Sequence, residues 1–371
     1  MIRLLIVDDS ALMRRHLQKI FEAEGDFELE MARNGLEAIE LARQFDPDVI
    51  TLDINMPEMD GLTALSMLMA EQPRSVVMFS SLTEQGAIAS LEALALGAVD
   101  FFPKPGGTIS LNIDQVRDSL VAKVRAAASA QLKKAGKLRA TPAAPTPSRG
   151  EPEPVEKLVE MPTDQGEGLV LIGSSTGGPR TLEEILPKLP ASYPWPLVIA
   201  QHMPANFTRA FAERMNNTCA LTVVEVSKPM PLEPGRAYVG MGGSDICISR
   251  RAGRPYAIPK PENKAYLWHP SVSLMVETAM QHFLPSQLIG VMLTGMGYDG
   301  ADEMAELKRR GGRTLAESKE SSVVFGMPAE LIRRGGATEI MACTEMAATL
   351  IRWGSGKSIT SSRVPRHAAH S

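Results

Sequence analysis

Leu169-Val-Leu-Ile-Gly-Ser-Ser-Thr-Gly-Gly-Pro179 is the stretch of the chain that indicates its fold most directly. Its apolar beginning predicts a buried strand, its glycines predict a tight turn, and residues 181–186 predict a following helix. Such a unit places Ser175 at the end of a sheet with its hydroxyl exposed. The glycines leave room for a substrate to approach the backbone, so Ser175 is a candidate nucleophile.

A glycine-rich turn between a strand and a helix is also a common place to bind phosphate, so that alternative stands beside the first. Residues 173–178 contain neither Gly-x-Gly-x-x-Gly nor Gly-Lys-Ser/Thr, which are the nucleotide-binding patterns. They do fit Gly-x-Ser-x-Gly, from Gly173 to Gly177. That pattern is weak by itself, so the choice depends on other residues of the same half.

One histidine and one aspartate follow later apolar segments in the same way. His202 comes after residues 196–201 and before Met203-Pro204, and Asp299 lies in the turn 295–300 after the apolar segment 288–294. Open α/β sheets carry their sites at the carboxyl ends of their strands. Three other residues of this half have other interpretations. His269 is expected in a loop that could touch substrate, His282 falls in a helical pattern and is expected to be structural, and Asp302 is expected to be a charge in the first turn of a helix.

These three residue types suit ester or amide hydrolysis. A serine hydroxyl needs a base to take its proton, and the imidazole of His202 titrates near neutrality. A carboxylate at Asp299 would fix the tautomer of that imidazole and stabilise its charged form. Backbone amides at Thr176 and in the 295–297 turn could bind an oxyanion. The order Ser, His, Asp differs from the order in α/β-hydrolases and indicates another fold.

The N-terminal half carries a second, independent set of polar residues at predicted strand ends. These residues are Asp8, Asp9, Asp53, Ser80 and Lys104. Three carboxylates at one sheet edge repel one another unless a hard divalent cation such as Mg²⁺ joins them. The set as a whole suits an acyl phosphate on Asp53, with the metal and the lysine balancing the charge that develops during transfer.

The alternation of strands and helices determines the expected fold class. Helical patterns at residues 12–24, 35–44, 61–70 and 88–96 separate the N-terminal strands, which predicts a parallel sheet with both faces covered. We expect an α/β protein with two doubly wound parallel-sheet domains. A length of 371 residues with 44% hydrophobic and 22% charged residues agrees with two globular domains.

Composition divides the chain and excludes several classes of protein. We expect domains at 1–125 and 168–356, a proline-rich linker at 126–167 and a disordered tail at 357–371. A net charge of −4 argues against nucleic-acid binding, and three cysteines without a Cys-x-x-Cys pair fit a reducing cytoplasm. Neither a signal peptide nor a membrane-spanning run is expected, so we predict no direct membrane insertion.

The motifs of both halves together resemble one family, the chemotaxis response-regulator protein-glutamate methylesterases. In the N-terminal half the resemblance rests on residues 7–14, 52–61, 80–83 and 104–105. In the C-terminal half it rests on Gly173–Gly178, Gln201–Pro204, Phe207–Arg214, Leu293–Gly297, Asp299–Gly300 and Val323–Pro328. It implies a flavodoxin-like receiver followed by a methylesterase domain.

The resemblance also implies roles for individual residues. Asp53 would be phosphorylated, Asp8 and Asp9 would hold Mg²⁺ with it, and the receiver switch would comprise Ser80, Lys104 and Phe101. The catalytic triad would be Ser175, His202 and Asp299. Thr176 and Met296 would supply the oxyanion amides, and we expect no cofactor in the esterase site. The implied reaction is demethylation of glutamate methyl esters on chemoreceptors with release of methanol, together with deamidation of receptor glutamines. A chemotaxis histidine kinase would donate the phosphate, and we expect a cytoplasmic monomer.

Four residues depart from the family's usual pattern: Asp245, His269, Ser273 and Tyr298. We expect all four in loops along the substrate path, where they would affect the choice of target. Two other functions stay open. One is a signalling adaptor with an idle esterase domain, which the complete Ser/His/Asp set disfavours. The other is a receiver-fused transcriptional regulator, which the acidic composition disfavours.

Overall fold

The computed structural model describes residues 1–104, 109–130 and 167–355. In the N-terminal half, five parallel strands form one sheet in the order β2-β1-β3-β4-β5. The strands are β1 (Ile2–Val7), β2 (Phe27–Ala32), β3 (Val49–Asp53), β4 (Ser75–Ser80) and β5 (Asp100–Pro103). The helices are α1 (Ala11–Glu22), α2 (Gly35–Phe45), α3 (Gly61–Glu71), α4 (Glu84–Leu96) and α5 (Ile109–Ala128).

Both faces of this sheet are buried because successive strand residues point to opposite sides. Leu4 and Ile6 belong to the apolar cluster that includes α1 and α5, whereas Leu5 and Val7 belong to the cluster that includes α2, α3 and α4. Helices α1, α2, α3 and α4 each begin after a residue whose side chain caps the helix. Helix α4 begins four residues before the predicted start because the Thr83 hydroxyl accepts a hydrogen bond from the Gly86 amide.

The C-terminal half contains a seven-stranded parallel sheet in the order β15-β14-β13-β6-β7-β10-β8. Its strands are β6 (Leu169–Ser174), β7 (Leu197–Gln201), β8 (Thr222–Val226), β10 (Arg236–Gly240), β13 (Leu288–Met292), β14 (Arg313–Glu317) and β15 (Glu339–Met341). Its α-helices are α6 (Gly178–Ile185), α7 (Ala205–Thr218), α8 (Val272–His282), α9 (Ala301–Arg309), α10 (Met327–Arg333) and α11 (Cys343–Gly354). Two short 3₁₀ turns are η1 (Leu186–Lys188) and η2 (Pro285–Gln287).

The two faces of this second sheet are also covered. Val170 and Ile172 of β6 lie in a cluster with α6, α7 and α11, whereas Leu169 and Leu171 lie in a cluster with α8, α9 and α10. The predicted class, two α/β domains built on doubly wound parallel sheets, is therefore confirmed. No helix among the described residues is long and apolar enough to cross a membrane.

A third sheet was not expected from the sequence. It is antiparallel, in the order β11-β12-β9, and consists of β9 (Met230–Pro231), β11 (Asp245–Arg251) and β12 (Arg254–Lys260). Ala252 and Gly253 join β11 to β12 with φ of 47° and 80°, which is the backbone of a tight hairpin. Its first residue, Asp245, lies beside the site described below.

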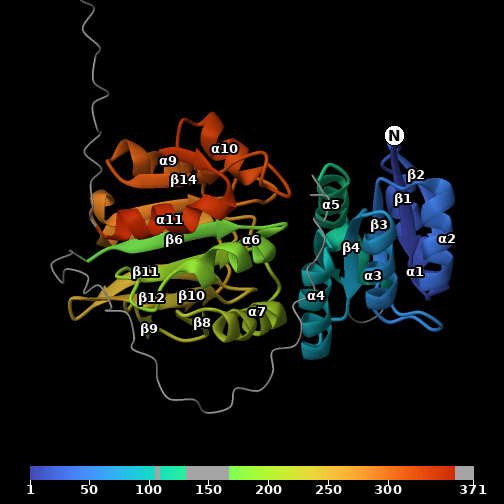
Figure 1. Cartoon of the computed structure of the whole chain (residues 1–371), viewed down its shortest axis with the longest axis horizontal. Coiled ribbons are helices and arrows are strands. Elements are labelled where there is room, and N and C mark those ends of the chain that lie inside the picture. The colour runs from blue at the N-terminus through green and yellow to red at the C-terminus, as the bar shows by residue number, and fades with distance from the viewer. Residues whose placement is uncertain (105–108, 131–166, 356–371) are drawn as a thin grey trace, which may run out of the picture.

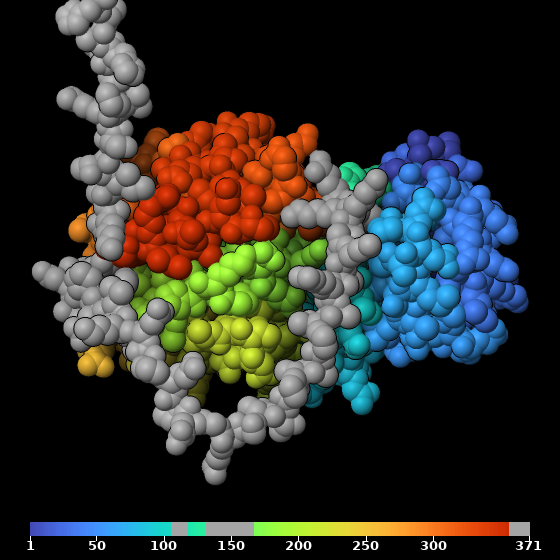
Figure 2. Space-filling view, in the orientation of Figure 1, coloured from blue at the N-terminus to red at the C-terminus, as the bar shows by residue number. Residues whose placement is uncertain are grey.

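The two halves lie side by side with helices α4 and α5 of the first facing the second (Figure 1). The space-filling view shows the two bodies packed against each other (Figure 2). At the boundary the rings of Phe101 and Phe207 stack with centroids 4.4 Å apart, and the Asn206 side-chain amide donates to the Leu82 carbonyl oxygen at 2.5 Å. One apolar cluster continues from the first half into the second through this contact.

Candidate active site

Ser175 is the first residue after β6, at the carboxyl edge of the second sheet. Its amide donates to the carbonyl oxygen of Thr294 at 3.0 Å, which ties the turn to the segment after β13. Gly177 has a φ of 79°, and helix α6 begins at the next residue. The neighbouring Ser174 is fully buried, and its hydroxyl donates to Gln201 Oε1 at 2.6 Å. Ser175 is partly exposed, so only it of the two serines can meet a substrate.

The turn at residues 295–297 packs directly against Ser175. A Cβ at Gly295 would lie 2.7 Å from the Cβ of Ser175, so no larger residue fits there. The turn therefore places Met296 near the serine. Among the described residues, no hydrogen-bond partner exists for the backbone amide of Thr176 or of Met296. Thr176 follows Ser175 and Met296 follows Gly295, so both free amides belong to segments that meet at the serine, and free amides there are what an oxyanion site requires.

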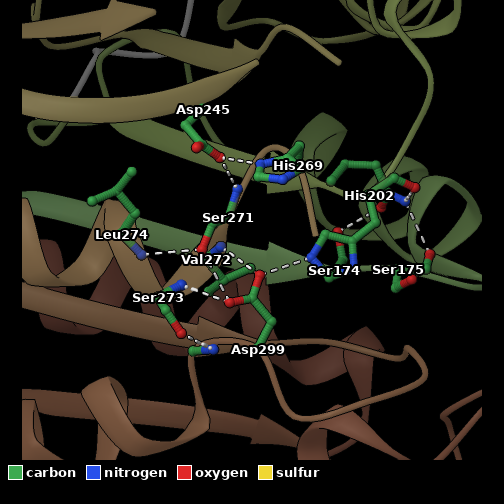
Figure 3. A network of polar contacts seen from close by, with 12 residues as sticks. Ser174, Ser175, His202, Asp245, His269, Ser271, Val272, Ser273, Leu274 and Asp299 are labelled. Carbon is green, nitrogen blue, oxygen red and sulfur yellow. Dashed lines mark hydrogen bonds and ion pairs between the residues drawn. The ribbon is translucent and has the colours of Figure 1, made fainter. Parts of the chain in front are cut away.

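His202 and Asp299 form a close pair, and Figure 3 shows His202 between Ser175 and Asp299. The distance from His202 Nε2 to Asp299 Oδ2 is 2.9 Å, and both side chains are nearly buried. The other ring nitrogen, Nδ1, is buried and has no hydrogen-bond partner in the described part of the chain. Because Asp299 accepts from Nε2, that nitrogen carries the proton and Nδ1 is free to act as a base.

Asp299 is held at the start of helix α8. It accepts hydrogen bonds from the amides of Val272 at 2.7 Å and Ser273 at 2.9 Å, and from the hydroxyl of Ser271 at 3.2 Å. Burial alone would raise the pKa of this carboxyl, but the hydrogen bonds from His202 and from the two amides outweigh burial and lower the pKa. Asp299 is therefore ionised and fixed in place.

Aromatic side chains complete the surroundings of His202. The ring of Trp268 lies parallel to the imidazole, with centroids 5.7 Å apart and planes 2° apart. Tyr298 meets Trp268 edge-on at 5.1 Å and is 49% exposed. The sequence motifs did not single out Trp268 as a site residue, because 66 positions separate it from the histidine that it contacts.

The expectation that all four departures from the family pattern lie in loops is wrong for two of them. Asp245 is the first residue of β11 and is buried, and Ser273 lies in the first turn of α8. Both side chains have partners: the Ser273 hydroxyl donates to Glu303 at 2.7 Å, and the buried Asp245 accepts from His269 at 2.9 Å. His269 and Tyr298 do lie outside helices and strands. As the sequence indicated, His282 lies in helix α8 and Asp302 in the first turn of α9.

The first half has a cluster of carboxylates at its own carboxyl edge. Asp8, Asp9 and Asp53 each offer an oxygen, and these oxygens lie within 4.8 Å of one another. Lys104 Nζ lies 2.7 Å from Asp53 and 2.8 Å from Asp8. Burial raises the pKa of Asp53 to about 6, with Asp8 adding to the shift and Lys104 opposing it. Three carboxylates with one lysine leave excess negative charge, which fits a Mg²⁺ ion.

The side chains of the other two predicted switch residues have partners other than the carboxylates. Ser80 ends β4, is buried, and donates from its hydroxyl to the Gly86 carbonyl oxygen at 2.8 Å. Phe101 is buried on β5 against Phe207 of the second half. Strand β5 thus joins the boundary at Phe101 to the segment carrying Lys104.

A direct hydrogen bond joins the two halves beside the serine. The hydroxyl of Thr176 donates to Asp100 Oδ2 at 2.6 Å, and Lys123 Nζ lies 3.0 Å from the same oxygen. Asp100 is the first residue of β5, and Thr176 follows Ser175. Neither residue is part of a motif that indicates this contact, so the sequence analysis missed it.

Comparison with known proteins assigns the family. The profile of the CheB methylesterase family matches residues 170–350, and that of the response regulator receiver domain matches residues 4–113. A protein of Rhodospirillum rubrum, named protein-glutamate methylesterase/protein-glutamine glutaminase 3, is 54% identical over 95% of this chain and 96% of its own length. This chain belongs to the CheB methylesterase family. The resemblance inferred from the motifs is therefore confirmed.

Further members of the family are similar over nearly the whole chain. The protein-glutamate methylesterase/protein-glutamine glutaminase 2 of Rhodopseudomonas palustris is 50% identical, covering 95% of this chain and 98% of that protein. Among solved structures, the CheB methylesterase catalytic domain of Thermotoga maritima is similar, with 36% identity and a TM-score of 0.49, covering 51% of this chain and 99% of that one. The receiver assignment supports the usual Mg²⁺ requirement of phosphorylation.

Proposed function

We propose that this chain is a phosphorylation-activated protein-glutamate methylesterase. It hydrolyses glutamate methyl esters on chemoreceptors and releases methanol, and it deamidates receptor glutamines. Its relatives carry the names of both activities, and its receiver half supplies the phosphorylation site. The observation that carries the proposal is the His202–Asp299 pair beside Ser175, with two free amides around the serine.

The reaction begins with the hydroxyl of Ser175. As its oxygen attacks the ester carbonyl, Nδ1 of His202 takes the proton, and Asp299 stabilises the imidazolium through Nε2. The amides of Thr176 and Met296 donate to the oxyanion. Collapse of the tetrahedral intermediate breaks the bond to methoxide, which leaves as methanol with the proton from His202.

A water molecule completes the cycle. His202 takes its proton as the water attacks the acyl-serine, and Ser175 leaves with that proton, so that glutamate is released. With a glutamine substrate the leaving group is ammonia, and the rest of the sequence is the same. Trp268, parallel to the imidazole, shields one ring face from water throughout.

Phosphorylation takes place in the receiver half. Asp53 accepts the phosphoryl group from a chemotaxis histidine kinase, and Asp8, Asp9 and Asp53 would hold Mg²⁺, which would balance the phosphate charge. Lys104 contacts Asp53 and would neutralise a further negative oxygen. Ser80 and Phe101 would pass the change to the boundary between the halves.

The receiver inhibits by covering the esterase site, and two contacts support this. Asp100 binds Thr176 next to the nucleophile, and Phe101 stacks on Phe207, which lies five residues after His202. Helix α5 and the 296–297 turn also line one cavity of about 520 Å³, so the receiver lies close to the turn that carries Met296. Each contact uses a segment next to a proposed catalytic group, so a receiver in this position limits access to that group.

The domain limits expected from the sequence, 1–125 and 168–356, separate the half that would be phosphorylated from the half that would hydrolyse the ester. Helix α5 continues to Ala128, three residues beyond the first limit, and most of the expected linker and all of the expected tail lie outside the described residues. We also propose that the enzyme acts as a monomer in the cytoplasm, where the kinase and the receptor substrate segments would meet it.

Methanol release from methylated receptor membranes tests the proposed function. The wild-type protein with Mg²⁺ and a phosphodonor should release methanol well above the rate of Ser175→Ala, and EDTA should remove the response to the phosphodonor. A wild-type rate equal to that of Ser175→Ala would contradict the proposal and favour an adaptor without catalysis.

A further inference from the structure

A second carboxylate–imidazole pair, Asp245 with His269, is connected to the first through a single residue, Ser271, which hydrogen-bonds to both aspartates. The side chain of Asp245 is fully buried and accepts three hydrogen bonds: from His269 Nδ1 at 2.9 Å, from the Ser271 amide at 3.0 Å and from the Asn263 amide at 2.8 Å. Figure 3 shows Asp245 on the opposite side of Ser271 from Asp299. A buried carboxylate with three donors is a strong local anchor.

The segment anchored by Asp245 contacts the proposed catalytic pair at two points. Ser271 donates from its hydroxyl to Asp299 Oδ1 at 3.2 Å and caps helix α8 by accepting from the Leu274 amide at 3.2 Å. Trp268, three residues earlier, lies parallel to the ring of His202. The segment that contains Trp268 and Ser271 therefore touches both members of the proposed catalytic pair. Apart from Asp299, the only buried carboxylate that bonds to this segment in the described structure is Asp245.

We propose that Asp245 is a positioning residue for hydrolysis, and the proposal rests on the function given above. It fixes residues 263–271 so that Ser271 holds Asp299 and Trp268 holds the face of His202. It acts through these two residues and does not touch substrate. Displacement of a catalytic group by about 1 Å can lower a rate about 100-fold, so an anchor of this kind affects turnover strongly.

Replacement of Asp245 by asparagine disturbs the anchor with little change in shape. An asparagine has one acceptor oxygen, and its NH₂ group must face either the Asn263 amide or the Ser271 amide, both of which are donors. We expect kcat per folded enzyme to fall about 10- to 100-fold, with KM changed less than about threefold, because no substrate contact is lost. Asp302→Asn, an exposed carboxylate on α9, is the matched control.

The experiment uses the full-length protein with Mg²⁺ and a phosphodonor, assayed by methanol release and referred to the folded fraction from near-ultraviolet circular dichroism. The pair His269→Leu and His269→Asn tests the same anchor without changing the carboxylate. His269→Leu removes one donor and should lower kcat, and His269→Asn restores a donor at the position of Nδ1 and should recover most of the loss. The two His269 variants test the proposal if Asp245→Asn does not fold.

A double-mutant cycle tests the route through Ser271. The loss in Asp245→Asn/Ser271→Ala should be smaller than the product of the two single losses, because the hydroxyl that Asp245 positions is already absent. The proposal is overturned if Asp245→Asn lowers kcat no more than Asp302→Asn, if both His269 variants match the wild type, or if the two losses multiply. Failure of the wild-type protein to release methanol would instead overturn the proposed function, so the two failures are distinguishable.

Discussion

At the scale of single residues, the two adjacent serines have different expected roles: Ser174 stabilises the fold, and Ser175 is the proposed nucleophile. Ser174 is buried and donates to Gln201, whereas Ser175 is partly exposed beside two free amides. We expect Ser175→Ala to abolish methanol release with little change in the free energy of unfolding. Ser174→Ala should keep substantial activity and lose about 1 kcal/mol of stability with its buried hydrogen bond. Methanol assays and urea unfolding of both variants check this, and a dead Ser174→Ala beside an active Ser175→Ala would reverse the assignment.

Asp299 differs from an ordinary exposed aspartate in the number of donors that it satisfies. In Asp299→Asn the side-chain NH₂ faces His202 Nε2 or the amides at the start of α8, and all of these are donors. We expect kcat to fall ~10²–10⁴-fold because the imidazole loses its tautomer and its charge partner. Steady-state kinetics at pH 7 measures the effect, and a loss below about tenfold would assign Asp299 a minor role.

The sequence predicted where three of the candidate site residues lie because they follow strand ends. Ser175, His202 and Asp299 each come just after an apolar run, and parallel strands bring such positions to one edge. The partners of Asp299 in helix α8 could not be predicted in the same way. Ser271, Val272 and Ser273 meet it only because α8 packs against strands far away in the sequence.

At the scale of elements, helices α1 to α4 agree with the four ranges predicted for the first half to within four residues at each end, whereas the hairpin of β11 and β12 was missed. Pro255 and Pro259 both lie in β12, and proline normally argues against a strand because it lacks an amide hydrogen. The hairpin tolerates them in a three-stranded antiparallel sheet where neighbouring residues supply the pairing. That sheet also places Asp245, the first residue of β11, beside the site.

Strand β5 and the turn before α6 are linked by the hydrogen bond from Thr176 to Asp100. A hydrogen bond to a charged group contributes about 1.5–3 kcal/mol, and its loss should shift the enzyme toward the uncovered form. We expect Thr176→Val, which removes the donor, to raise the methanol-release rate of the unphosphorylated protein about tenfold or more, and Asp100→Asn, which removes the charge but keeps an acceptor, to act in the same direction with a smaller effect. Asp118→Asn, an exposed carboxylate on α5, is the control. Equal basal rates in Asp100→Asn and Asp118→Asn would show that this bond has no part in inhibition.

At the scale of the whole molecule, the receiver and the esterase share one continuous apolar cluster through Phe101 and Phe207. The sequence predicted two domains, but it could not predict which of their surfaces meet. The contacts depend on single side chains such as Asn206 and Leu82, which carry no motif for docking. Interfaces of this kind within one chain are modest, so a phosphoryl group on Asp53 needs to shift only a small free energy.

The central claim is that a receiver covers a competent esterase until Asp53 is phosphorylated. The measurement that tests it most directly is methanol release by the fragment 168–356 and by the full-length protein with and without a phosphodonor. The account predicts that the fragment is faster than the unphosphorylated protein, that the phosphodonor raises the full-length rate toward the fragment, and that Asp53→Ala stays slow under both conditions. A fragment slower than the unphosphorylated full-length protein would contradict the claim, because the receiver would then help to build the active site.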